Sequence, residues 1–549
     1  MSMSRIAIYT AMALSAILAM RSSPTGTTTP PAAMVAGSEA CSFCHQEIYQ
    51  SYEKTVMARA SGAAGDGLIT GEFDDKTSGV RYRVYTQEGR VWMSYERAGG
   101  LKGQKELLFF VGSGKKGRTY LFSDEGYLFE APINWYSQER RWNMTPAYID
   151  APEIPMNLPS YSSCLNCHTS GLQPRVPGTR NKFAGKPFLH SGITCERCHG
   201  EGEAHLADGK GSIVNPAKLT AERRDSVCME CHFEGTVAVT QPGRRVYQFR
   251  PGDTLSDYVH YFVLIKTQTE ESKALSQFEA LSMSLCKEKS GEKMWCGSCH
   301  DPHMEPSEAE KVTYYRGKCL NCHGRAFGEK HHPDKPDCRQ CHMPDLPSRD
   351  VAHTQSTDHR ILRNPRAPQL TTRMANLSLK IFPVDQAARV TTRDLALAWF
   401  ELAQRGVEGA EHKAEEYLSK ALQESPNDPQ LLSSLGFMEQ KRGHEKEARE
   451  LYEKSLQLRP RSNTVATNLG VLEAKRGDLR DAVMLWQRAF ARVPYRSVIG
   501  MDLAMAFCAA GQREQARQYV QRVLEFNPDD GQARKMMANL DGKPGRCGP

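Results

Sequence analysis

Residues 195–205 read CERCHGEGEAH, and the first five of them carry the pattern that decides the fold. Two cysteines three positions apart, followed at once by histidine, occur seven times in the 549-residue chain. A chain of this composition would contain roughly 0.02 such motifs by chance. Numbered 1 to 7 in chain order, the motifs are Cys41/Cys44/His45, Cys164/Cys167/His168, Cys195/Cys198/His199, Cys228/Cys231/His232, Cys296/Cys299/His300, Cys319/Cys322/His323 and Cys338/Cys341/His342.

This spacing is typical of covalent haem attachment. The two thiols form thioethers with the porphyrin vinyl groups, and the adjacent imidazole becomes the proximal iron ligand. A structural zinc site instead needs four ligands, usually from two half-sites at a regular separation. Seven half-sites at irregular separations favour haem over zinc or disulfides. The sequence therefore predicts seven haem c groups, held by the fourteen motif cysteines and ligated by the seven motif histidines.

The residue on the other face of each iron decides between a carrier and an enzyme, because only an open iron can bind a small molecule. Histidines outside the motifs nearly match the number of irons. His331 and His332 are adjacent, so only one of them is expected to ligate. Met57 is a possible ligand of the first haem, although core packing is favoured. The predicted distal candidates are His205, His303, His332, His359, His190, His260 and His353.

The N-terminus predicts export. Residues 1–20 carry one early arginine followed by mostly apolar residues, which is typical of a secretory signal and short for a membrane span. No cleavage site stands out, so an uncleaved membrane anchor is the alternative. A bacterial periplasmic or cell-surface location is expected.

The formal net charge of +7 does not indicate a nucleic-acid partner. Each ferric haem with ionised propionates brings about one negative charge, so seven of them roughly neutralise the chain. No nucleic-acid function is therefore expected.

The section without cysteines between motifs 1 and 2 alternates in the manner of β-strands. Val80, Tyr82 and Val84 precede the turn TQEGR, and Val91, Met93 and Tyr95 follow it. We expect a small antiparallel sheet here. The segment GSGKKGR lacks the complete phosphate-loop pattern, so a basic hairpin loop is predicted instead.

Residues 160–365 carry six motifs but little sustained periodicity. We expect mostly coil and short helices packed around the haems, which replace apolar side chains as the core. By analogy with metal-coupled folding, the haem-free protein should fold poorly.

The C-terminal section repeats every 34 residues. Proline, glycine and alanine each recur four times at this interval, as in Ala414, Ala448, Ala482 and Ala516. This period and composition indicate tetratricopeptide (TPR) repeats, an all-α solenoid suited to docking another protein. A stabilising cap without a ligand is the alternative. Cys508, in one of these helices, is expected to be a small buried side chain.

The chain is accordingly multidomain. The predicted boundaries are 1–36 for the signal peptide and linker, 37–66 for the first haem segment, 67–159 for the β-rich insert, 160–365 for the six-haem domain, 366–390 for a linker, 391–541 for the TPR domain and 542–549 for a tail.

Several segments together resemble a known family. CERCHGEGEAH, CGSCHDPH, HTQSTDHRI and the insert GSGKKGRTYLFSDEGYLFEAPINWYS are similar to bacterial multihaem c-type cytochromes with TPR repeats. The haem part resembles the tetrahaem cytochrome of hydroxylamine oxidation. The resemblance implies a periplasmic electron carrier, although relatives include enzymes. Nitrite reductases of this kind typically carry a Cys-x-x-Cys-Lys motif, which this sequence lacks.

These observations favour an exported heptahaem electron carrier whose TPR repeats dock a redox partner protein. The alternative is a multihaem oxidoreductase that converts a small nitrogen or sulfur compound at one haem with an open distal site.

Overall fold

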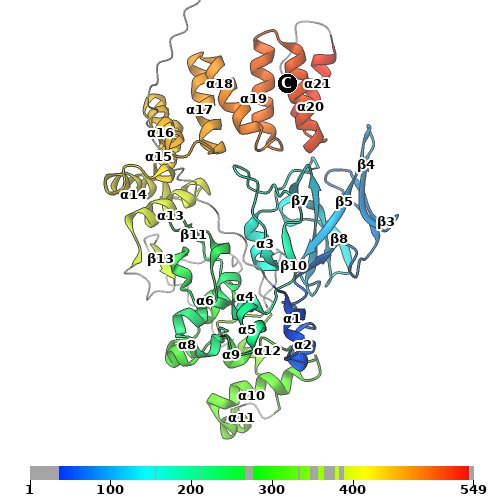
Figure 1. The fold of residues 1–549 in the computed structure, drawn as a ribbon, viewed down its shortest axis with the longest axis vertical. Helices are drawn as coiled ribbons and strands as arrows, with labels where there is room; N and C mark the ends of the chain where they lie inside the picture. The colour runs from blue at the N-terminus through cyan, green and yellow to red at the C-terminus, as the bar shows by residue number, and fades with distance from the viewer. Residues whose placement is uncertain are drawn as a thin grey trace, which may run out of the picture.

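The computed structural model describes residues 36–154, 156–211, 213–265, 276–331, 334–345, 357–363, 378–382 and 389–542. The repeats form an arch at the top of the molecule, with the β-rich insert and the motif section (residues 160–382) below it (Figure 1). No helix in the described ranges is long and apolar enough to cross a membrane. The predicted signal segment, His332, His353 and Cys547 lie outside the described residues.

The N-terminal part is a pair of short helices followed by an eight-stranded antiparallel sheet, in the order β2-β3-β4-β5-β6-β7-β8 with β1 beside β5. The six apolar positions expected to face the core are all buried. The turn between β3 and β4 is Glu88–Gly89, with φ of 52° and 73°, a conformation that matches the twist of a tight hairpin. The elements are α1 (Ser38–Ser42), α2 (Gln46–Tyr52), β1 (Ser61–Ala63), β2 (Gly71–Asp74), β3 (Arg81–Gln87), β4 (Arg90–Arg97), β5 (Leu101–Val111), β6 (Gly117–Asp124), β7 (Tyr127–Tyr136), β8 (Arg141–Met144) and η1 (Pro146–Tyr148).

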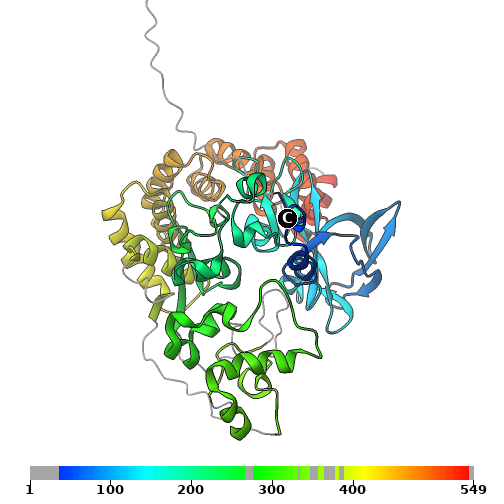
Figure 2. The same cartoon turned by 60° about the horizontal axis from the view of Figure 1, so that its bottom comes forward.

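The motif section consists of short helices joined by irregular chain, as the sequence indicates. It also contains two small antiparallel sheets that the sequence did not reveal, β10-β9 and β11-β12-β13. Its elements are α3 (Ser162–His168), β9 (Thr169–Leu172), β10 (Phe188–Ser191), α4 (Glu196–His199), α5 (Glu203–Asp208), η2 (Pro216–Lys218), α6 (Ala221–His232), β11 (Val237–Thr240), η3 (Val246–Gln248), η4 (Leu255–Asp257), β12 (Val259–Ile265), α7 (Gln277–Ser282), α8 (Leu285–Ser290), η5 (Gly291–Lys293), α9 (Cys296–Cys299), α10 (Lys311–His323), α11 (Arg325–His331), α12 (Arg339–His342) and β13 (Ser378–Phe382). Figure 2 shows α10 and α11 at the end of the molecule remote from the arch.

The C-terminal section folds as stacked helix pairs. The alanines spaced by 34 residues are fully buried, and a Cβ added at Gly436 would lie 2.9 Å from Cε1 of Tyr452, so small residues are required where helices cross. Cys508 is half-buried and disulfide-bonded, not an inert core side chain. The helices are α13 (Thr392–Gln404), α14 (Ala410–Glu424), α15 (Pro429–Arg442), α16 (Glu445–Leu458), α17 (Asn463–Arg476), α18 (Leu479–Phe490), α19 (Ser497–Ala509), α20 (Arg513–Phe526) and α21 (Gly531–Asp541).

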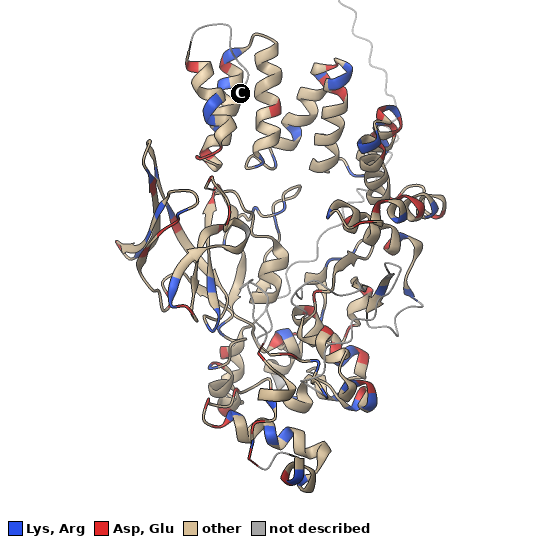
Figure 3. Cartoon of the chain, turned by 180° about the vertical axis from the view of Figure 1, so that it is seen from behind, with Lys and Arg blue, Asp and Glu red and all other residues tan. Residues whose placement is uncertain are grey.

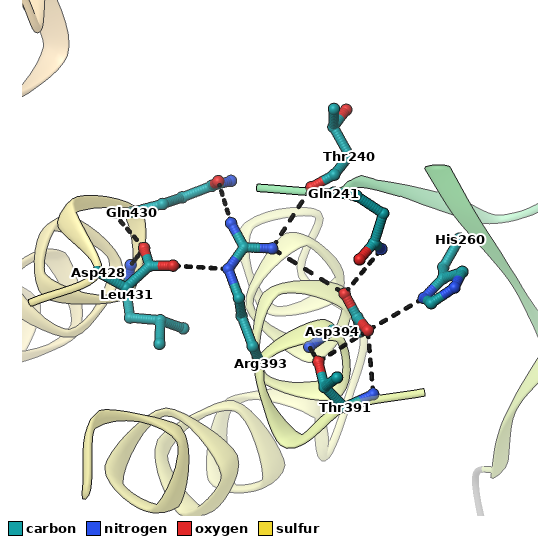
Figure 4. Close-up of polar contacts among 9 residues, drawn as sticks. All are labelled: Thr240, Gln241, His260, Thr391, Arg393, Asp394, Asp428, Gln430 and Leu431. Carbon is teal, nitrogen blue, oxygen red and sulfur yellow. Dashed lines mark hydrogen bonds and ion pairs between the residues drawn. The ribbon is translucent and has the colours of Figure 1, made fainter. Parts of the chain in front are cut away.

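The first end of the arch is fixed to the motif section. Asp394, at the start of α13, accepts hydrogen bonds from His260 of β12 at 3.0 Å and from the Gln241 side chain at 3.1 Å (Figure 4). Arg393 beside it pairs with Asp428 at 2.6 Å and donates to the carbonyl of Thr240 at 3.4 Å. The first repeat thereby shares a polar and apolar interface with β11 and β12.

The last repeats are fixed to the β-rich insert. Asp529, only 1% exposed in its side chain, pairs with Arg97 of β4 at 2.5 Å. Tyr127 and Phe129 of β7 pack against Tyr495 and Phe526 with ring centroids 5.3–6.1 Å apart. One hydrophobic core therefore includes both the sheet and the last repeats.

Candidate haem sites

The motif residues surround one large cavity of about 2890 Å³. An ordinary small-molecule pocket reaches roughly 1,000 Å³, so this volume suits several cofactors. Cysteines or histidines of motifs 2 to 7 line it, whereas motif 1 lies outside its wall. All fourteen motif cysteines are free thiols. The donor set and the space thus both fit covalently attached haems.

Four motif histidines face a second imidazole at a characteristic spacing. Two nitrogens bound at about 2.0 Å on opposite sides of one iron would place the imidazole centroids about 6.3 Å apart. The observed ring-centroid distances are 5.9–6.5 Å, with interplanar angles of 16–28°. Each pair could therefore hold one iron between two imidazoles. The pairs are His45–His205, His199–His303, His300–His359 and His342–His331.

Hydrogen bonds fix the tautomer of several of these rings. Nδ1 of His199 lies 2.8 Å from the carbonyl of Val214, and Nδ1 of His342 lies 2.6 Å from the carbonyl of Leu362. Because a carbonyl can only accept, Nδ1 carries the proton and Nε2 keeps the lone pair that a metal needs. The distal candidates show the same arrangement, with carbonyl contacts at 3.1 Å for His205 and 2.9 Å for His359.

The protein surroundings also keep ligand imidazoles neutral. Poor solvation in the cavity, together with the neighbouring His359, lowers the pKa of His300 to about 4. Poor solvation likewise lowers the pKa of His199 and His359. A neutral imidazole is the form that binds a metal, so the environment favours ligation at neutral pH.

Three further side chains discussed as ligands are placed as follows. His331 is the described residue opposite His342, whereas His332 lies outside the described residues and its predicted role is untested. His260 is absent from the cavity wall, and its Nδ1 bonds to Asp394, so we assign it to the repeat interface. Met57 lines the cavity, whereas His205 is the side chain opposite His45.

His190 lies on β10 beside the first motif segment. A Cβ added at Gly37 would be 2.7 Å from Cε1 of its ring, so only glycine permits this approach. His190 is thus placed next to motif 1, although His205 has the spacing that fits that haem. His353 lies outside the described residues.

Thiols of different motifs influence one another's pKa, and these contacts indicate which motifs are adjacent. The pKa of Cys41 is raised to about 12, first by burial and second by the charge of the Cys195 thiol, which also hydrogen-bonds to Cys41. Similar contacts join motifs 2 and 4, 4 and 5, and 6 and 7 through Cys167–Cys231, Cys228–Cys296 and Cys319–Cys338. Weaker electrostatic contacts join motifs 3 and 4 through Cys198–Cys231 and motifs 5 and 6 through Cys299–Cys322. The motifs thus form the series 1-3-4-5-6-7, with motif 2 branching from motif 4.

Spacer residues inside three motifs hold that junction together. Asn166 of motif 2 and Arg197 of motif 3 donate to the Glu230 carboxylate of motif 4, at 3.0 and 2.9 Å. Arg197 also donates to the backbone carbonyl of Asn166 at 2.9 Å. The Glu230 side chain is only 2% exposed, so the pair is buried. The sequence alone assigns no role to these spacers, because they are far apart along the chain and only the tertiary fold brings them together.

Motif 1 is attached to motif 3 in a related way. Glu196, a spacer of motif 3, accepts hydrogen bonds from the backbone nitrogens of Ala36 at 2.7 Å and Gly37 at 3.0 Å. Together with the Cys41–Cys195 contact, these bonds bring the two motifs together although more than 140 residues separate them along the chain.

Comparisons with known proteins find similarity to multihaem cytochromes and to tetratricopeptide repeats. The profile of the family "Cytochrome c554 and c-prime" matches residues 141–200, and tetratricopeptide-repeat profiles match residues 430–461 and 473–540. The multiheme cytochrome MtrA of Shewanella baltica (strain OS185) is 26% identical over 216 residues, covering 36% of this chain and 64% of MtrA. These similarities support a multihaem cytochrome with tetratricopeptide repeats. Covalently bound haem c is therefore its cofactor.

Two solved structures resemble part of this chain. MamA of Desulfovibrio magneticus RS-1 is 20% identical, covering 28% of this chain and 86% of that one, with a TM-score of 0.25. PilF of Pseudomonas aeruginosa is 23% identical, covering 27% and 68%, also with a TM-score of 0.25.

Proposed function

We propose that this cytochrome carries seven haems and passes electrons along the motif series 1-3-4-5-6-7. The observation that carries the proposal is the set of four imidazole pairs 5.9–6.5 Å apart, because two histidine ligands make an iron an electron carrier. Thiol contacts between motifs support close packing of successive haems. Motif 2, on a branch, would serve as a side site.

The ends of the series are the natural exchange points. Motif 1 lies outside the main cavity, with Cys44 and His45 exposed. Motifs 6 and 7 lie on α10 and α12, at the end of the molecule opposite the repeat arch (Figure 1). Electrons would enter at one of these ends and leave at the other.

Export and partner docking complete the proposal. A disulfide at Cys508 is consistent with an oxidising compartment, in keeping with the apolar N-terminus. The arch leaves Met484, Val498 and Met505 exposed on α18 and α19, a surface suited to a redox partner protein. Because the last repeats share a core with the sheet, deleting them would also destabilise the sheet. A deletion would therefore not test docking alone. A single substitution is therefore the appropriate test. Val498→Lys should abolish crosslinking to a periplasmic partner, whereas Leu458→Lys, at an exposed position of α16, serves as the control.

A second function, conversion of a small molecule at one iron, is favoured by a specific observation. In the described part of the chain, no second imidazole faces His232 or His323 at the spacing seen in the four pairs. Gln277 instead hydrogen-bonds to His232, and Phe327 lies against His323 with centroids 5.1 Å apart. Glu130 also lines the cavity, and burial raises its pKa to about 7, which suits a proton donor.

Haem quantification, electron paramagnetic resonance and carbon monoxide titration test the two functions together. Seven low-spin ferric haems without carbon monoxide binding would support the carrier. A high-spin haem that binds carbon monoxide would support the oxidoreductase. Fewer than seven haems per chain would contradict the heptahaem proposal itself.

A further inference from the structure

Six arginines lie along the junction between the repeat arch and the motif section. Three belong to the motif section, and three belong to loops between repeat helices. Charges of both signs are mixed over most of the molecule (Figure 3), and three arginines near other contacts of the repeats, Arg97, Arg393 and Arg522, each pair with a carboxylate. Within the described ranges, none of the six forms an ion pair with a carboxylate. We call this group the arginine seam: Arg175, Arg180, Arg245, Arg459, Arg492 and Arg496.

Direct contacts bring the two sides of the seam together. Asn463 of α17 donates to the carbonyl of Gly178 at 3.1 Å, in the loop that carries Arg175 and Arg180. A Cβ added at Gly178 would lie 2.8 Å from Cδ of Arg492, so that arginine rests on the same loop. Arg175 donates to the carbonyl of Arg180 at 3.4 Å.

Electrostatic contacts connect the remaining members. Burial raises the pKa of Tyr495, and the charges of Arg180 and Arg496 partly offset this, so both guanidinium groups are near its hydroxyl. Burial lowers the pKa of Arg459, and the charge of Arg245 lowers it further. Arg459 is attracted by Asp428, but that carboxylate pairs with Arg393.

The seam opens onto the haem cavity beside motif 2. Arg175, Arg180 and Arg245 line the cavity. The guanidinium of Arg180 lies over the ring of Tyr161, 4.5 Å from its centroid, and Tyr161 precedes Cys164 by three positions. The positive charge is therefore next to the haem that motif 2 would hold.

We propose that the arginine seam is an oxyanion-binding site serving the haem of motif 2. Guanidinium groups bind carboxylates and inorganic oxyanions through paired N–H donors, and six like charges without counter-ions repel one another until an anion neutralises them. The same chemistry fits two sources: the propionates of that haem, or a small free oxyanion entering from the interface. The inference rests on haem attachment at Cys164 and Cys167, and it places the repeats in the environment of a haem.

The test uses the full-length holoprotein with seven haems confirmed, in Tris chloride with sulfate as the probe. The variant is Arg492→Gln with Arg496→Gln. Its control, Arg480→Gln with Arg488→Gln, makes the same charge change at exposed, unpaired positions of α18. Arg180→Gln is a second variant on the cytochrome side. Redox titration and thermal unfolding with increasing sulfate, compared with chloride at equal ionic strength, are the readouts.

Each source gives its own result. If propionates fill the seam, the variant has a lower midpoint potential at one haem even when no sulfate is present. We expect a decrease of at least 59 mV, which is a tenfold change in the equilibrium constant for one electron. If a free oxyanion binds, sulfate raises the thermal unfolding midpoint of the wild type until the site is saturated. The variant then needs at least a tenfold higher sulfate concentration for the same increase. The proposal is overturned if both seam variants match the control in both readouts. A missing motif 2 haem would instead contradict the function proposed above.

Discussion

The Arg197–Glu230 pair shows how single residues hold the haem motifs in register. Both residues are spacers within Cys-x-x-Cys-His motifs, and their buried pairing joins motif 3 to motif 4. A buried ion pair adds little stability over an apolar pair, but removing one partner leaves an uncompensated charge. The main role of the pair is therefore to determine how motif 3 packs against motif 4.

Glu230→Ala should consequently destabilise the holoprotein by about 3–5 kcal/mol, because Arg197 would remain buried without its partner. Denaturant unfolding followed by haem absorbance measures this change. Glu201→Ala is the control, since Glu201 pairs with Arg250 at 3.7 Å on the surface, and such pairs contribute about 0–1 kcal/mol. Equal losses in the two variants would contradict the assigned role.

His331 is a second prediction at the residue scale. His331→Ala should convert one low-spin haem to a high-spin haem that binds carbon monoxide, because its ring is the one opposite His342. His332→Ala should leave the spin state unchanged. The reverse outcome would restore His332, the assignment expected from the sequence.

At the scale of elements, local patterns predicted more than long-range ones. The alternation around Tyr82 and Met93 predicted the β3–β4 hairpin, and the 34-residue period indicated the repeat helices. The small sheets of β9–β13 were missed because their strands are short and pair across irregular chain. The motif cysteines, like the hairpin, could be predicted because their pattern is local in the sequence. The contact of Asn166, Arg197 and Glu230 could not be predicted, because it depends on the tertiary fold.

The α13–β12 interface gives a pH prediction. Burial would raise the pKa of Asp394, but hydrogen bonds from His260 and Thr391 outweigh burial and lower it. A carboxyl group with a lowered folded pKa stabilises the protein above its unfolded pKa, and this contribution disappears as the pH falls through the folded pKa. Asp394→Asn should thus be less stable than the wild type at pH 7, with a smaller difference near pH 3. A difference that is constant with pH in thermal unfolding would exclude this contribution.

For the whole molecule, the decisive feature is that the repeat arch is fixed at both ends. Asp529 accepts hydrogen bonds from Arg97, from Arg534 at 3.0 Å and from the backbone nitrogen of Ile154 at 2.9 Å. The last repeat therefore supports the β-rich insert, in addition to any role of the solenoid in the docking proposed above.

Asp529→Ala should release the last repeats from the sheet and cost about 3–5 kcal/mol, because Arg97 loses its buried partner. Limited proteolysis should then cleave within α21 before the sheet is attacked. Asp541→Ala on the same helix removes only an exposed pair with Arg517, so its cleavage pattern should match the wild type. Protection of α21 in both variants would show that the aromatic contacts alone hold the arch.

The aromatic face of β7 also sets an order of assembly. Tyr127 and Phe129 are made early in synthesis, but Tyr495 and Phe526, which cover them, come from the far end of the chain. Since chains are made from the N-terminus, all fourteen motif thiols have emerged before the arch can close. The order of synthesis therefore permits haem attachment to begin before the last repeats pack on the sheet. Chains cut short before residue 495 would lack both Tyr495 and Phe526, would leave this aromatic face uncovered, and should be prone to aggregation.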